Sequence, residues 1–271
     1  MRAEMRFNAI VLAADRGPND PVTAAAAVAA KCLTPINGTP MALRVIRALQ
    51  ESGRIDTILL CGPTAEALHA STELSGSIDG SRVRWMSPHA TPSTSAAAAL
   101  AALPAGQPVL LTTGDHALLS PEIVRHFLDR SAEGGYDVAV ALAPHDLVRK
   151  AYPQSRRTVL KFSDGGFCSC NLFAFLSPHA RDMARRWTTV EAQRKKPIRV
   201  IGLVGWTAML LYALGALSLA GALRRISGQT GLAAGAVLMP FAEAAVDVDS
   251  VADLALVRKI AGKDGVESVT R

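Results

Sequence analysis

Short apolar runs alternate with stretches of helical character through the first half of the chain. The runs at 9–14, 56–62, 83–87, 108–115 and 136–144 are typical of strands that are buried on both faces. Between them, 40–53, 64–72, 94–103 and 120–135 are expected to be helices, the last capped by Ser120 with Pro121 in its first turn. This alternation predicts an α/β fold with a mostly parallel, doubly wound sheet, whose ligand lies at the carboxyl ends of the strands.

The pattern changes after residue 150. We expect strands at 158–162, 166–176 and 235–249, separated by helices between Pro178 and about Ser227. Residues 200–223 contain no charged side chain, a length at which a membrane span must be considered. Three interpretations stay open: a buried or groove-forming helical hairpin, which small residues favour, contact with a membrane surface, and a span, which would fit badly between two parts of one sheet.

Composition and charge narrow the class of protein. The 271 residues are 49% hydrophobic, enough for one large α/β domain or two small ones, and the four cysteines follow no disulfide or zinc spacing. We therefore expect a reducing compartment, and a cytoplasmic protein because the N-terminal apolar run is too short for a signal peptide. The net charge is +6, but aromatic residues are only 5% and do not interleave with basic ones. Phosphate on a small substrate or a lipid is thus a better partner than nucleic acid.

The first candidate site is the loop in which the run at 9–14 ends. Asp15, Arg16, Gly17 and Pro18 follow the apolar residues directly. Exposed backbone amides after a strand can cradle a triphosphate, and Arg16 and Lys31 could add positive charge. The loop matches neither a Walker A nor a G-x-G-x-x-G sequence, and an ordinary turn between strand and helix stays an alternative.

Two further candidates are acidic. Asp115 follows the strand ending at Thr113–Gly114, and since Ser120 already caps the next helix, Asp115 is available as a hard oxygen ligand for magnesium. Asp247 and Asp249 lie two residues apart at an expected strand end, with Ser250 capping the helix that follows. One of them could complete a metal site with Asp115, although a helix N-cap cluster explains the spacing equally well.

The three motifs, taken in order, resemble the molybdenum-cofactor guanylyltransferase-like (MobA-like) nucleotidyltransferases. "IVLAADRG…AAKCLTPINGTPMALRVIRAL" is similar to their L-A-G/A-G-x-G and K-x-L-L-P-I-x-G-x-P segments, "TTGDHALLSPEIV" to G-D-x-P-L-x-x-P, and "VDVDSVADLALV" to D-I-D-T-P-E-D-L. The resemblance covers residues 7 to about 145 and 235 to 262 well, and the stretch between them weakly.

The resemblance implies a single Rossmann-like domain with the GT-A nucleotidyltransferase fold, and Mg²⁺-dependent transfer of a nucleoside monophosphate from an NTP to a phosphorylated acceptor, with release of pyrophosphate. It assigns nucleotide binding to Leu12, Ala13, Ala14, Asp15, Gly17, Lys31, Ser93, Ser95, Thr113 and Gly114. It assigns catalysis to Lys31, Arg16 and Asp115, and magnesium binding to Asp115 and Asp249, with Asp249 a better match than Asp247.

Two residues depart from the family pattern. Asp15 replaces a glycine and places a negative charge beside the expected triphosphate. Asn19 stands about where many members have a phosphate-binding arginine, so Arg16 is expected to substitute for it.

The acceptor side is expected in the weakly matching segment. Arg156, Arg157, Lys161 and Asn171 are candidates for binding an anionic acceptor, although a solvated basic face explains the arginines equally well. Residues 194–225, with basic borders around the uncharged stretch, suggest peripheral contact with an anionic membrane. We therefore divide one domain, 1–271, into a nucleotide-binding part (1–145 and 235–271) and an acceptor-side and helical insertion (146–234).

Two other functions remain as alternatives. A GT-A glycosyltransferase would use a nucleotide sugar and a D-x-D metal motif, which Asp247 and Asp249 form, but nearer the C-terminus than suits that role. A nucleotide-binding regulatory protein without catalysis is favoured by Asp15 and Asn19.

Overall fold

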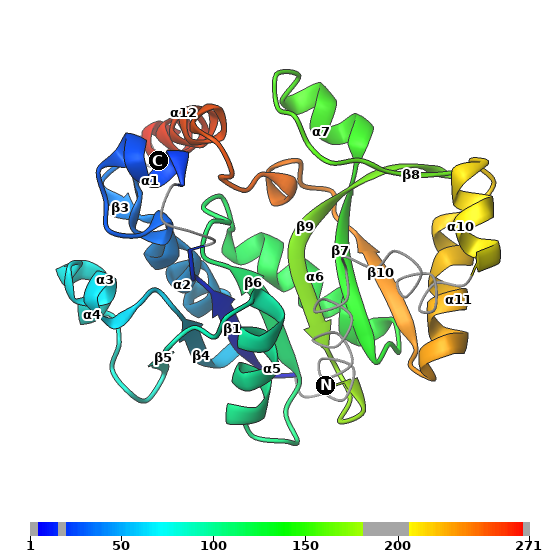
Figure 1. Cartoon of the computed structure of the whole chain (residues 1–271), viewed down its shortest axis with the longest axis horizontal. Helices are drawn as coiled ribbons and strands as arrows, with labels where there is room; N and C mark the ends of the chain where they lie inside the picture. The colour runs from blue at the N-terminus through cyan, green and yellow to red at the C-terminus, as the bar shows by residue number, and fades with distance from the viewer. Residues whose placement is uncertain (1–4, 16–19, 181–205, 268–271) are drawn as a thin grey trace.

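A mixed sheet forms the centre of the molecule (Figure 1). The computed structural model describes residues 5–15, 20–180 and 206–267. The strand order is β10-β7-β9-β6-β1-β4-β5, with β8 paired to β9 outside this path. The strands are β1 (Phe7–Leu12), β4 (Ile55–Cys61), β5 (Val83–Met86), β6 (Val109–Thr113), β7 (Val138–Pro144), β8 (Leu160–Phe162), β9 (Gly165–Phe175) and β10 (Ala234–Leu238).

Most neighbouring strands are parallel, as predicted. β1 pairs in parallel with β4 and β6, β4 with β5, and β7 with β10, whereas β9 runs antiparallel to both β6 and β7. Strand β9 belongs to the segment assigned to the acceptor side, yet it lies inside the sheet. That segment is therefore built into the same core as the nucleotide side.

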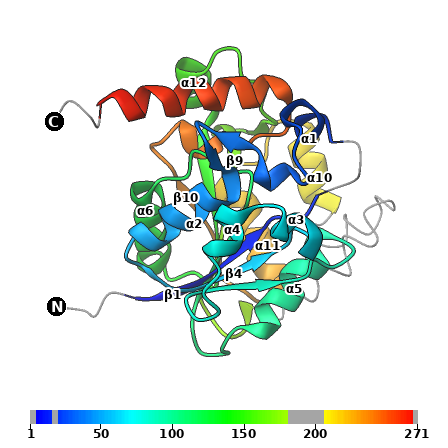
Figure 2. The same cartoon turned by 90° about the vertical axis from the view of Figure 1, so that its left-hand side faces the viewer.

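Helices cover both faces of the sheet. One core cluster joins alternate β1 residues such as Val11 to α2 (Met41–Glu51) and α6 (Pro121–Glu133), and a second joins Ile10 to α5 (Pro92–Ala102) and α11 (Leu219–Thr230). Because successive strand residues point to opposite faces, a strand covered on both sides must be apolar throughout. Figure 2 shows this layered arrangement from the side.

A third cluster brings the end of the chain to the carboxyl ends of the strands. Val246 and Val248 pack with Ala117 and Leu118, together with residues of α1 (Pro21–Ala26) and α12 (Val251–Glu267). Both views show α12 beside α1 (Figures 1 and 2). Apolar burial therefore holds residues 246–248 against the turn that follows β6.

Several sequence predictions need correction. The expected strand at 235–249 ends at Leu238, and a 3-10 turn, η2 (Glu243–Ala245), follows. Val246 and Val248 beyond it pack with α1 and α12 instead of with a neighbouring strand. The loop before Lys31 contains the unpredicted helix α1, capped by Asp20. The remaining elements are η1 (Lys31–Leu33), β2 (Pro35–Ile36), β3 (Thr39–Pro40), α3 (Ala65–His69), α4 (Thr72–Gly76), α7 (His145–Ala151) and α10 (Trp206–Ala213).

The uncharged stretch at 200–223 forms two short helices where it is described. α10 and the start of α11 are joined by a turn at Gly215, whose φ is +67°. Leu217 is buried, whereas Leu210, Tyr212 and Leu214 are exposed. Among the described residues, no helix has both the length and the apolar character needed to cross a bilayer.

Candidate functional site

The loop after β1 lies between the ends of its two neighbouring strands. The Ala13 N–H donates to the Cys61 carbonyl at 2.8 Å, and the Gly114 N–H donates to the Leu12 carbonyl at 2.7 Å. Gly62 adopts φ +89°, and a Cβ built there would lie 2.8 Å from the Ala14 nitrogen. Only glycine allows this approach, so Gly62 lets the loop pass close to the end of β4. Arg16 and Gly17 lie outside the described residues.

Asp15 ties this loop to the segment that carries Lys31. Its Oδ1 accepts a hydrogen bond from the Lys31 backbone N–H at 2.9 Å. Burial raises the pKa of Asp15, and the hydrogen bond from Lys31 opposes this rise. The aspartate that replaces a family glycine thus has a partner within the protein.

Lys31 bridges the two carboxylates that the resemblance assigns to magnesium. Its Nζ lies 2.7 Å from Asp115 Oδ2 and 2.9 Å from Asp249 Oδ1. Burial alone would lower the pKa of Lys31, but Asp115 and then Asp249 raise it above its ordinary value. The Lys31 and Asp115 side chains are mostly buried, whereas 47% of the Asp249 side chain is exposed.

Three separate chain segments converge here. Asp115 follows the end of β6, Lys31 begins η1, and Asp249 immediately precedes Ser250 and helix α12. The Val248 N–H donates to the Asp115 carbonyl at 3.2 Å, so the backbone itself joins the second and third segments. The structure therefore brings together Lys31, Asp115 and Asp249, which lie far apart in the sequence.

The arrangement fits a magnesium ion that is shared with a bound phosphate. Asp115 Oδ1 is buried and has no hydrogen-bond partner in the described structure. A buried carboxylate oxygen without a partner is costly, and a divalent cation would satisfy it. Among the described residues, no group of three or more His, Cys, Asp or Glu could hold a metal ion. Magnesium usually needs only one or two carboxylates when phosphates complete its coordination, so Asp115 and Asp249 stay predicted ligands.

Asp247 has different partners from Asp249. Its Oδ1 pairs with Arg157 Nη1, and its Oδ2 accepts from Asn171 Nδ2 at 2.8 Å. Burial and then the Asp249 charge raise the pKa of Asp247, whereas Arg157 lowers it. Arg157 also pairs with Asp253.

The four residues predicted to bind the acceptor differ in their exposure and in their partners. Arg157 and Asn171 bind acidic groups of the protein itself, Arg156 and Lys161 are exposed, and the Lys161 N–H donates to the Tyr212 hydroxyl at 3.2 Å. Their role toward an acceptor stays a prediction.

The residues predicted near the base or ribose differ in their contacts within the protein. Ser95 is buried, and its Oγ accepts from the His89 N–H at 2.9 Å, so it holds the loop before α5. The Ser93 hydroxyl contacts Thr91 Oγ1 at 3.2 Å at the start of α5. Thr113 ends β6 next to Leu12, and its Oγ1 is buried without a partner in the described structure.

Sequence reasoning missed His116. Its side chain is only 1% exposed, and burial lowers its pKa to about 4, so the ring is neutral beside Asp115. The sequence shows a histidine directly after Asp115, in the turn that follows an apolar strand. It does not show how deeply a residue in such a turn is buried.

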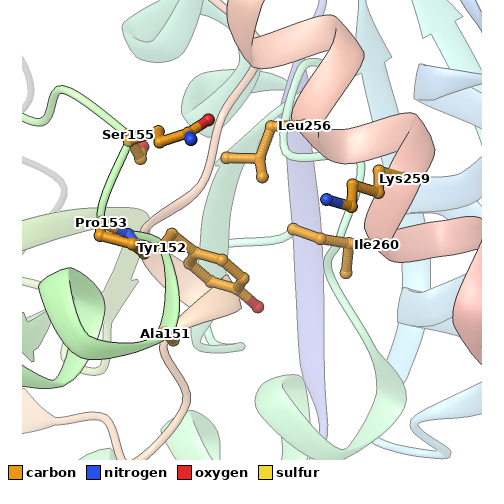
Figure 3. Close-up of a pocket in the computed structure, with 8 residues that line it drawn as sticks. Ala151, Tyr152, Pro153, Ser155, Leu256, Lys259 and Ile260 are labelled. Carbon is orange, nitrogen blue, oxygen red and sulfur yellow. The ribbon is translucent and has the colours of Figure 1, made fainter.

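A cavity of about 250 Å³ lies between the segment after α7 and helix α12 (Figure 3). It is bordered by residues 151–155 on one side and by Leu256, Lys259 and Ile260 of α12 on the other. Of the predicted nucleotide-binding residues that the structure describes, none lines it.

Comparison with known proteins identifies the family and the fold. A model of the MobA-like NTP transferase domain matches residues 9–234, a range that ends before Asp247 and Asp249. A hypothetical transferase from Thermus thermophilus is 29% identical, with a TM-score of 0.74, over 92% of this chain and 100% of that one. No curated protein matches.

Two more distant solved structures share the fold. They are 4-diphosphocytidyl-2C-methyl-D-erythritol synthase from Anaerococcus prevotii (11% identity, TM-score 0.59, 96% and 100% of the two chains) and CMP:2-keto-3-deoxy-manno-octonic acid synthetase complexed with CTP (13%, 0.56, 96% and 99%). The family match over most of the chain shows that this protein belongs to the MobA-like NTP transferases.

Proposed function

We propose that this NTP transferase moves a nucleoside monophosphate from an NTP to a phosphorylated acceptor in a Mg²⁺-dependent reaction that releases pyrophosphate. The observation that carries the proposal is the position of Lys31 Nζ, 2.7 Å from Asp115 and 2.9 Å from Asp249, beside the loop after β1. In this arrangement the Lys31 amine can bind a phosphate group, and the two carboxylates can bind the divalent cation that accompanies it.

Each residue then has a defined task. Lys31 binds the triphosphate and offsets its charge, and the loop Leu12–Asp15 lies along it. Asp115 and Asp249 would hold magnesium, which supplies charge neutralisation on the phosphates. Little proton transfer is needed because the attacking phosphate is already ionised, so catalysis is positioning and electrostatic stabilisation. Arg16 and Gly17 keep their predicted roles but lie outside the described residues.

The contacts of Asp247 disfavour the glycosyltransferase alternative. In a D-x-D site both carboxylates would serve the same nucleotide-bound metal. Here the Asp247 oxygens contact Arg157 and Asn171, while Asp249 contacts Lys31. A regulatory protein without catalysis has no observation in its favour beyond Asp15 and Asn19, and Asp15 has a partner in Lys31.

For the acceptor, we propose an amphiphilic molecule reached at an anionic membrane surface. Leu210, Tyr212 and Leu214 are exposed together around the turn after α10, and the exposed Arg224 lies on α11 nearby. The basic residues 194–199 lie outside the described residues. Flotation with phosphatidylglycerol vesicles should recover the protein in the lipid fraction, and absence from that fraction would remove this part of the proposal.

The reaction itself is tested by pyrophosphate release. Each of the four NTPs is incubated with Mg²⁺ and with phosphorylated alditols, cyclitols or lipids, and EDTA is the control. One NTP should give acceptor-dependent pyrophosphate, whereas a glycosyltransferase would form none from NTP. A nucleotide-binding regulator would show only a ligand-dependent rise in melting temperature.

A further inference from the structure

A single buried guanidinium holds both sides of the turn that carries Asp249. Arg157 pairs through Nη1 with Asp247 and through Nη2 with Asp253, so its two partners flank Asp249 in the sequence. The Arg157 side chain is 9% exposed, and its Nε donates to Ser155 Oγ at 2.9 Å, which orients the planar group. We infer that Arg157 is a positioning residue, which sets the place of the Asp249 carboxylate relative to Asp115 without touching substrate. The catalytic meaning of this inference rests on the proposed function.

All the carboxylate oxygens of the two partners are occupied. Asp247 contacts Arg157 and Asn171, and Asp253 contacts Arg157 through Oδ1 and receives the Ser250 hydroxyl at its Oδ2 at 2.6 Å. Ser250 Oγ in turn accepts from the Asp253 N–H at 3.2 Å, as an N-cap does. The guanidinium therefore acts on the start of α12 as well as on the residues before it. A planar fork can hold two carboxylates at once, and an ammonium group has no such geometry.

A distortion in β9 brings Asn171 into this network. Val140 pairs with Phe173 and Leu142 with Ser169, so residues 170–172 of β9 stand opposite Ala141 alone. Asn171 has φ +50° in this bulge, and its Nδ2 reaches Asp247 Oδ2 at 2.8 Å. Bulges commonly redirect a side chain toward a functional site, and here the redirected amide secures the residue two positions before Asp249.

These contacts position Asp249 together with the apolar packing of its neighbour Val248. The Asp249 side chain itself is 47% exposed. The Arg157 fork and the Val248 N–H to Asp115 bond thus fix the turn together with the apolar burial of Val246 and Val248.

The first test needs no metal or nucleotide. In hydrogen exchange of the metal-free protein, Arg157→Gln should speed exchange of the Val248 and Asp253 amides at least fivefold and leave β1 and β4 unchanged. Arg149→Gln is the matched control, because Arg149 is exposed and paired only with the exposed Asp146 in the described structure. Equal exchange of these amides in Arg157→Gln and the unchanged protein would overturn the inference.

The second test measures the consequence for the metal. Mn²⁺ binding is followed by electron paramagnetic resonance in the presence of tripolyphosphate, which carries the phosphate chain common to all NTPs. Arg157→Gln should weaken Mn²⁺ binding about tenfold, Arg157→Lys should restore part of it, and tripolyphosphate binding in EDTA should change less than twofold. Mn²⁺ affinity within twofold of the unchanged protein in a folded Arg157→Gln, or an equal loss in Arg149→Gln, would overturn the inference.

The design separates the two proposals. If the unchanged protein binds neither Mn²⁺ nor tripolyphosphate, the proposed function fails, while the exchange result still decides the role of Arg157. If Arg157→Gln does not fold, Asp253→Asn replaces it, because it keeps the side-chain shape and removes one charged partner of the guanidinium. Faster exchange of the Val248 amide and weaker Mn²⁺ binding, both of smaller size, are then expected, and unchanged Val248 exchange in Asp253→Asn would overturn the inference.

Discussion

Two groups of carboxylates meet at the candidate site, and they differ in how their oxygens are satisfied. In the first group, which we call the open pair, Asp115 and Asp249 share the Lys31 amine, and Asp115 Oδ1 is buried without a partner in the described structure. In the second, the closed pair, Asp247 and Asp253 share Arg157, and Asn171 and Ser250 occupy the remaining oxygens. Buried polar networks that are fully satisfied give rigidity, whereas an unsatisfied oxygen is a place for a ligand. We therefore infer that the aspartates of the open pair bind a ligand, whereas those of the closed pair hold the protein in place around it.

The largest effect should come from removing the cation of the open pair. We expect Lys31→Met to lower kcat/KM for pyrophosphate release by about 10²–10³-fold, because a preorganised charge on the transferred phosphates is lost. The same assay on Lys259→Met, which removes an exposed lysine of α12, should give the unchanged rate. Full activity in Lys31→Met would mean that the open pair is not where the triphosphate is held.

The two pairs also differ in how far sequence reasoning could reach. Asp115 follows a short apolar run whose strand character is local, and parallel strands place their carboxyl ends together, so its position at the sheet edge beside the loop after β1 could be predicted. Lys31 follows α1 at the start of η1, and the family resemblance indicated its role there. The closed pair depends on partners 90 and 96 residues away from Arg157 in the chain. It also depends on a bulge at Asn171 that no local pattern indicates. Arg157 is in a basic run that predicts a solvated or anion-binding face, and only the tertiary fold shows which carboxylates approach it.

Much of the fold could be predicted because most of its elements are local. The apolar runs became β1, β4, β5, β6 and β7, and Ser120 caps α6 as expected. The end of the chain was harder. Val246 and Val248 are apolar like strand residues, but they are buried by α1, α12 and the turn at 117–118 instead of by a neighbouring strand.

The next prediction concerns His116, the buried residue that directly follows Asp115 of the open pair. Burial lowers its pKa from 6.5 to about 4, so the folded protein binds fewer protons than the unfolded chain between these values. Stability is therefore fully present above about pH 6.5 and is lost as the pH falls toward 4, by about 3 kcal/mol at 1.36 kcal/mol per pH unit.

Urea unfolding at pH 7.5 and pH 4.5 measures this loss. His116→Gln cannot titrate, so its free energy of unfolding should fall by about 2–3 kcal/mol less over this interval than that of the unchanged protein. His69→Gln, at an exposed position of α3, is the control and should lose as much as the unchanged protein. An identical acid sensitivity in His116→Gln would show that the imidazole is not buried in its neutral form.

The smallest effect should come from Gly62, which lies close to the loop after β1 and does not contact the closed pair. In Gly62→Ala the new methyl group would lie 2.8 Å from the Ala14 nitrogen at a φ of +89°, so the loop after β1 must shift. We expect about 1–3 kcal/mol of destabilisation by urea unfolding. Tripolyphosphate binding should weaken, while exchange at Val248 and Asp253 stays unchanged because Arg157 is not touched.

Gly76→Ala is the matched control: it ends helix α4 with nothing within 4 Å of the new Cβ, so its stability should be unchanged or slightly higher. If Gly62→Ala also speeded exchange at Val248 and Asp253, the two pairs would be one mechanical unit, and the distinction between an open and a closed pair would be lost.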